Sequence, residues 1–214
     1  MAPATTSGAP VAAWELPAEE LGRQSLYRVQ LRAGEERGSL RLVLRLWDPA
    51  RFELAATDAL GRSLWSLRSA GGAAVWSERD RGGPCALAAG RTIRWPRFGL
   101  TFPASDLPWL LIGRLPEPPS TPAGGATAGE SEIATASGRR FRVTIAGGLP
   151  VRWSALDEAG DPTLTWTRDE DGGRLDGAEG LEVRWRRVSS EAVAGAPPEP
   201  PAGDLPECDL EQLR

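Results

Sequence analysis

The sequence predicts a mainly β protein, an unclosed antiparallel β-barrel (half-barrel) of about 9–11 strands with a short helical lid or plug. Apolar and polar residues alternate strictly in run after run of the 214 residues, which is typical of half-buried antiparallel strands. Turn-forming residues separate these runs. One short segment is apolar on nearly every side and must be buried. Long strands with one apolar face curl around that face, which favours a barrel or half-barrel.

The alternation is clearest in SLRLVLRLW (39–47), whose leucines share one face while Arg41, Arg45 and Trp47 share the other. The runs LYRVQLR, RFELAAT, RRFRVTI, VRWSA, TLTWTR and LEVRWRR repeat it, with turns such as GEERG, WDPA and DEDGG between them. The apolar faces either line a cavity that takes up lipid or form a filled core, and the pattern fits both. The candidate lining positions on strands are Leu40, Leu42, Leu44, Leu46, Phe52, Leu54, Phe141, Val143, Trp153, Trp166 and Trp185.

The segment PASDLPWLLIGRLP (103–116) predicts the buried helix. Ser105 is a suitable N-cap, Asp106 suits the helix dipole, Pro108 is tolerated in the first turn and Gly113 can end the helix. We expect this helix to lie against the concave apolar face as a lid or plug. It adds three residues to the candidate lining: Leu107, Leu110 and Leu111.

Composition divides the chain into a disordered N-terminal segment (1–13), one domain (14–188) with a flexible linker at 117–132, and a Pro-rich tail (189–214). The opening MAPATTSGAP lacks the basic start and apolar middle of a signal peptide. Either the protein is cytoplasmic, or the leading Met-Ala replaces a removed leader. No run of about 18 apolar residues occurs, so we expect no membrane-spanning helix.

Composition also argues against an enzyme. The chain has no histidine, the commonest general base and metal ligand, so we expect no catalytic residues, no cofactor and no metal site. Its 25 basic residues, all arginines, stand against 29 acidic ones, and no basic patch large enough for nucleic acid is evident. Cys85 and Cys208 either form one disulfide in an oxidising compartment or remain two buried thiols.

The stretch TDALGRSLWSL (57–67) predicts a hairpin with Leu60 at its tip, where Asn, Asp or Gly is usual. Leu60 either folds back onto its own hairpin or stays exposed to touch a membrane. Leaving a leucine in water forgoes about 1.5–3 kcal/mol of burial. The hairpin alone does not decide between these two placements.

Three segments in order resemble the LolA/LolB family of bacterial outer-membrane lipoprotein carriers and receptors. They are RFELAATDALGRSLWSLRSAGGAAVWSERD (51–80), RFGLTFPASDLPWLLIGRLPE (97–117) and LPVRWSALDEAGDPTLTWTRDEDGGRLDGAEGLEVRWRRV (149–188). The resemblance implies an unclosed barrel with a helical lid, whose apolar interior takes up acyl chains. It also implies that Leu60, directly before Gly61, is the exposed membrane-contacting residue of the LolB hairpin.

The expected function is therefore that of a non-catalytic periplasmic lipid- and lipoprotein-binding protein that shelters acyl chains and delivers lipoproteins to the outer membrane. Its expected partners are an acylated lipoprotein or phospholipid, the inner leaflet of the outer membrane and other envelope proteins, with no nucleic acid. Its expected place is the periplasmic face of that membrane, as a lipoprotein whose leader and anchor cysteine are missing from this sequence. The alternative is an envelope scaffold with the same fold and a filled core, which docks partners through its Pro-rich linker and tail.

Overall fold

The computed structural model describes residues 14–70, 72–79, 83–87, 92–95, 100–120, 129–199 and 205–208. Only the backbone is described for residues 92–95 and 100–102 and for Glu179. The predicted disordered segment 1–13 lies outside the described residues.

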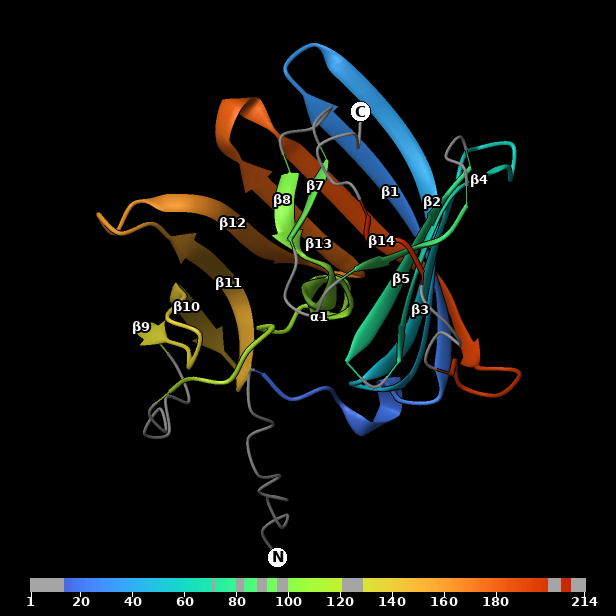
Figure 1. Ribbon diagram of the computed structural model, residues 1–214. Helices are drawn as coiled ribbons and strands as arrows, with labels where there is room; N and C mark the ends of the chain where they lie inside the picture. Colours follow the sequence, from blue (N-terminus) through green and yellow to red (C-terminus); the bar gives the residue numbers. More distant parts are fainter. Residues whose placement is uncertain are drawn as a thin grey trace, which may run out of the picture.

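Twelve strands form one antiparallel sheet that is not closed into a barrel (Figure 1), which confirms the predicted fold class. These strands are β1 (Arg23–Ala33), β2 (Glu36–Asp48), β3 (Arg51–Thr57), β4 (Ser63–Ala70), β5 (Ala73–Glu78), β6 (Cys85–Leu87), β9 (Gly129–Ala134), β10 (Arg140–Ala146), β11 (Leu149–Leu156), β12 (Pro162–Asp169), β13 (Gly172–Gly177) and β14 (Glu182–Ala192). The remaining elements are β7 (Thr92–Trp95), β8 (Leu100–Pro103), α1 (Leu107–Ile112) and the 3₁₀ turns η1 (Ala18–Glu20), η3 (Ala104–Asp106) and η4 (Ala178–Gly180).

The order across the main sheet is β6-β5-β4-β3-β2-β1-β14-β13-β12-β11-β10-β9. Two meanders, β1 to β6 and β9 to β14, are thus joined where β1 pairs with β14, with Val29 opposite Trp185. The first and last long strands therefore meet in the middle of the sheet. Strands β7 and β8 form a separate two-stranded sheet.

The core lies on the concave face of the main sheet, and Figure 1 shows α1, β7 and β8 inside its curve. Strand β1 illustrates the arrangement, because Tyr27, Val29 and Leu31 are buried while Arg28 and Gln30 between them are exposed. Every residue that the sequence placed in the candidate lining is buried. The strict alternation of the sequence thus corresponds to one buried and one solvated face of a curved sheet.

The main sheet is larger than the predicted 9–11 strands. Strand β6 has only three residues, too few to show alternation, and β9 begins at Gly129, inside the segment expected to be a linker. Residues 121–128 of that segment lie outside the described residues. Strand β14 runs to Ala192, past the predicted domain end at 188, because Ser189–Ala192 continue the pairing with Arg23–Leu26 of β1. Over the described ranges, no helix is long and apolar enough to cross a bilayer.

Candidate functional site

Helix α1 is a single buried segment of six residues that covers the concave face. Pro108 lies in its first turn, and Gly113 ends it in the left-handed conformation with φ 76°, both as predicted. The predicted N-cap role of Ser105 is wrong. Ser105 lies in η3, the residue at the cap position is Asp106, and neither side chain bonds the helix N-terminus. The carboxylate of Asp106 instead accepts a hydrogen bond from Arg139, which lies in the turn between β9 and β10.

A small cavity lies between α1 and the main sheet. Its volume is about 50 Å³, well below the roughly 300–1,000 Å³ of a ligand pocket. All of its lining residues are apolar: Val29, Leu31, Leu40, Leu42, Leu107, Leu110, Leu111, Leu175, Val183 and Trp185. With the helix in this position, the space between α1 and the main sheet is nearly filled.

Only part of the predicted lining borders this cavity, namely Leu40, Leu42, Leu107, Leu110, Leu111 and Trp185. The other predicted positions are buried in the surrounding core: Leu44, Leu46, Phe52, Leu54, Phe141, Val143, Trp153 and Trp166. Sequence reasoning missed Val29, Leu31, Leu175 and Val183 as lining residues. Val29, Leu31 and Val183 occupy apolar positions in alternating runs, whereas Leu175 lies in the run GGRLDG, which shows no alternation.

Two tryptophans of the sheet hold the C-terminal end of α1. Trp185 Nε1 donates a hydrogen bond to the Leu111 carbonyl at 3.2 Å. Gly113 lies against the ring of Trp166, where a Cβ atom would stand 2.6 Å from Cζ2. Trp166 in turn stacks on Trp153 with ring centroids 6.1 Å apart. The helix end is therefore seated on a rigid aromatic pair, and only glycine fits at position 113.

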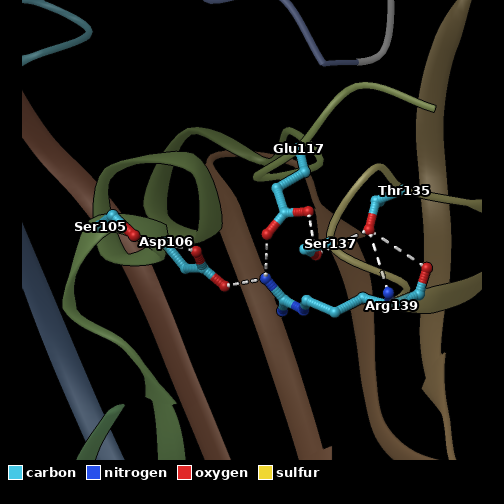
Figure 2. Close-up of polar contacts among 6 residues, drawn as sticks. All are labelled: Ser105, Asp106, Glu117, Thr135, Ser137 and Arg139. Carbon is cyan, nitrogen blue, oxygen red and sulfur yellow. Dashed lines mark hydrogen bonds and ion pairs between the residues drawn. The ribbon is translucent and has the colours of Figure 1, made fainter. Parts of the chain in front are cut away.

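A polar cluster, which we call the Arg139 network, holds the segment that contains α1 at both ends (Figure 2). Arg139 Nη1 donates to Asp106 Oδ2 at 2.7 Å, just before the helix, and to Glu117 Oε1 at 3.3 Å, after it. Ser137 Oγ donates to Glu117 Oε2 at 2.5 Å, and Thr135 Oγ1 accepts the backbone N–H of Arg139 at 3.1 Å. The network thus ties the lid to the turn between β9 and β10.

The buried carboxyl of Asp106 makes stability depend on pH. Burial raises the pKa of Asp106, while the charge and hydrogen bond of Arg139 act in the opposite direction. Between its ordinary pKa and the raised one, the native chain holds a proton that the unfolded chain lacks, so the free energy of unfolding falls as pH rises through that window. We expect D106N to lose this component, so that wild type loses stability relative to D106N from acidic to neutral pH. Denaturant unfolding of both proteins at a series of pH values measures it; parallel curves would contradict it.

The tip of the β3–β4 hairpin presents an apolar side chain to solvent. Leu60 is 80 % exposed. Asp58 Oδ1 accepts the backbone N–H groups of Leu60 and Arg62, each at 2.9 Å, and Gly61 adopts φ 80° between them. These bonds fix the turn, so Leu60 is held away from its own hairpin and does not fold back onto it. The backbone N–H of Arg62 is the main cause that lowers the pKa of Asp58, which keeps this capping carboxylate ionised.

Comparison with solved structures shows which fold this is. A LolA superfamily protein from Nitrosomonas europaea superposes with a TM-score of 0.55 at 9% identity, over 83% of this chain and 88% of that one. The chain has the LolA fold. A domain from Vibrio parahaemolyticus assigned to outer-membrane lipoprotein sorting gives 0.54 at 13% identity, over 83% and 87% of the two chains. A DUF1329 family protein from Desulfovibrio piger gives 0.52 at 10% identity, over 81% and 86%.

These likenesses confirm the resemblance at the level of the fold. No family model matches the sequence, and no curated protein matches it either. At such low identity, the LolA fold says how the chain is built, while the role of each residue has to come from its own surroundings.

Cys85 and Cys208 are joined by a disulfide across a sequence separation of 123 residues, which decides between the two alternatives left open by the sequence. The Cys208 backbone N–H also donates to the Ala86 carbonyl at 2.9 Å. Part of the tail is thus fastened to the edge strand β6. Elsewhere in the described part of the chain, no group of three or more His, Cys, Asp or Glu residues could hold a metal ion.

Proposed function

We propose that this protein is a non-catalytic carrier of acyl chains, which shelters the lipid part of a lipoprotein or a phospholipid between α1 and the main sheet. The observation that carries the proposal is the wholly apolar cavity roofed by a single short helix. An acyl chain gains about 0.8 kcal/mol for each CH₂ group that it buries there. No bond is made or broken in this mechanism, and transfer depends on where the chain is most favourably buried.

Uptake requires α1 to move, because a cavity of about 50 Å³ cannot hold an acyl chain. The helix is suited to this movement. It has six residues and takes no part in the strand pairing of the main sheet. The two ion pairs that hold its flanking residues, Asp106 and Glu117, both belong to the Arg139 network. Rearrangement of the network would open the interior while the twelve-stranded sheet stays intact.

Release is assigned to the β3–β4 hairpin. Leu60 is exposed and its turn is fixed by Asp58, so the side chain can enter a membrane without refolding of the tip. Burial of this leucine in lipid would gain about 1.5–3 kcal/mol. We place the protein at the periplasmic face of the outer membrane, in keeping with the disulfide and with the lipoprotein-sorting assignment of the Vibrio domain. Delivery of lipoproteins to that membrane is the corresponding role.

Native mass spectrometry of gently purified protein, combined with lipid extraction of the same sample, tests the carrier function. We expect one bound acylated molecule per chain, or loading to that level after incubation with an acylated peptide. A protein that stays free of lipid after both treatments would contradict the carrier function.

A second candidate is an envelope scaffold with a filled core, and the small volume of the cavity favours it. Its docking segments would be the Pro-rich linker and tail. The disulfide to Cys85 leaves less of the tail free for docking than the sequence suggested. The lipid-free outcome of the mass measurement would support this candidate.

A further inference from the structure

The outer face of the sheet carries three arginines side by side at its centre. Arg28 on β1 stands opposite Arg41 on β2 and opposite Arg186 on β14, and all three side chains are exposed. Like charges placed directly opposite each other across strands are destabilising. Within the described ranges, no carboxylate forms an ion pair with any of the three. Among the described residues, the repulsion between these three positive charges is therefore not offset by a neighbouring glutamate or aspartate.

A groove of about 630 Å³ adjoins this row, towards the β1–β2 turn. Arg32, Arg37 and Arg184 contribute to its lining, together with the polar side chains of Gln30 and Ser39, which pair across β1 and β2. The polar lining residues lie on the solvated face, because Val29 and Leu31, which alternate with them on β1, are buried. Leu31 borders both this groove and the cavity beneath α1.

A second hollow of about 240 Å³ continues the groove along the sheet. It shares Gln30 and Arg184 with the first and adds Arg28 and Arg186. We call the two together the arginine groove; its arginines are Arg28, Arg32, Arg37, Arg184 and Arg186.

Few negative charges oppose these arginines. The carboxylates that line the groove are Glu182 and Asp169. Glu182 is already occupied, since it pairs with Arg184 at 2.5 Å and with Arg174 at 3.4 Å. The groove is therefore a positive region in a chain whose net charge is −4. Such a local excess attracts and orients a negatively charged partner.

We propose that the arginine groove binds an extended, acidic segment of a partner protein. Guanidinium groups match carboxylates with two parallel hydrogen bonds each, and side chains on alternate positions of a strand would meet every second residue of an extended peptide. The side-chain amide of Gln30 and the hydroxyl of Ser39 can form hydrogen bonds with the backbone of the bound peptide. The arginine side chains lie on the face of the sheet opposite the apolar interior, so partner recognition and acyl binding would occur on opposite faces of one sheet.

The groove fits a protein segment better than a membrane. It is a hollow of about 630 Å³, which an extended peptide can enter and a flat bilayer cannot follow. It also faces outward from the middle strands β2, β1 and β14, whereas Leu60 lies in the turn between β3 and β4.

Fluorescence polarisation with a labelled hexaglutamate peptide tests the proposal, with hexaglutamine as the uncharged probe. The groove variant is R28Q/R186Q. The matched control is R140Q/R142Q on β10, which removes the same charge from arginines already paired with Glu132. We expect the groove variant to bind hexaglutamate roughly tenfold more weakly and the control to stay within about twofold of wild type. Thermal unfolding of both variants checks the fold, and removal of like charges should leave R28Q/R186Q at least as stable as wild type.

Several results would overturn the proposal. One is that hexaglutamate does not bind near physiological ionic strength, and another is that hexaglutamine binds equally well. A third is that R140Q/R142Q loses as much affinity for hexaglutamate as R28Q/R186Q does, which would indicate general attraction to net charge. Phosphatidylglycerol vesicles are the further probe. If R28Q/R186Q lowered binding to the vesicles and not to the peptide, the groove would be a membrane surface instead. None of these results depends on whether the interior carries lipid.

Discussion

Replacement of Leu60 by glutamate is expected to slow acyl transfer to membranes by about 10- to 100-fold, because about 1.5–3 kcal/mol of favourable burial is lost at the step in which the tip enters the bilayer. Acyl binding by the free protein should not change, since Leu60 is 80 % exposed and is not part of the cavity lining. Its free energy of unfolding should stay within about 0.5 kcal/mol of wild type. The assay follows a pyrene-labelled fatty acid as it leaves the loaded protein for phosphatidylethanolamine–phosphatidylglycerol vesicles.

Val188 provides the matched control for this experiment. The residue is 53% exposed, and it is the other large apolar residue that is strongly exposed in the described part of the chain. It lies within strand β14 and not at a hairpin tip. Val188→Glu adds the same charge and should transfer lipid at the wild-type rate. Equal slowing by both variants would show that negative charge alone repels the vesicles. A wild-type rate for Leu60→Glu would remove the tip from the mechanism.

Gly113→Ala is expected to lower the free energy of unfolding by about 2–5 kcal/mol and to loosen α1. Two effects add up. The left-handed conformation at φ 76° costs a residue with a Cβ atom about 1–2 kcal/mol, and overpacking of a filled core costs about 1–3 kcal/mol. The added methyl group would meet Cζ2 of Trp166 at 2.6 Å, and Trp166 is fully buried against Trp153. Denaturant unfolding measures the stability, and hydrogen exchange of the residues in α1 reports the loosening of the lid.

Gly61→Ala separates the two effects. Gly61 adopts nearly the same backbone conformation, φ 80°, and a Cβ atom there would meet nothing within 4 Å. Only the backbone cost of about 1–2 kcal/mol should appear. If both variants lost the same stability, the contact between the lid and Trp166 would not be tight.

Most of the long strands could be predicted because each carries its own signal. A half-buried strand must alternate, so Leu40 to Leu46 revealed both the strand and its buried face without any knowledge of its neighbours. The lid was predictable for a related reason, since a short segment without a polar face has to be covered. Strand β9 gave no such signal. It is an edge strand whose sequence GESEIA is half-buried or exposed throughout, so it read as linker.

The site was less predictable because it depends on long-range pairing. Which alternating positions border the cavity depends on the contact of β1 with β14, two strands at opposite ends of the chain. Val29 and Leu175 were therefore indistinguishable from other core positions. The role of Arg139 was also hidden, since ASGRR signals only a turn, and its contact with Asp106 spans 33 residues of sequence. Leu60 could be recognised as a candidate contact residue from the sequence, because a large apolar residue at a hairpin tip is unusual.

The central claim is that an acyl chain occupies the space between α1 and the sheet, and quenching of tryptophan fluorescence by brominated stearic acid tests it most directly. Trp185 borders the cavity, whereas Trp47 lies on the outer face, where its Nε1 reaches the Gly195 carbonyl. We predict that brominated stearic acid quenches wild type more than stearic acid does, that Trp185→Phe loses most of this difference, and that Trp47→Phe keeps it. Equal quenching by the two acids, or a difference lost in Trp47→Phe and kept in Trp185→Phe, would contradict an acyl chain in the interior.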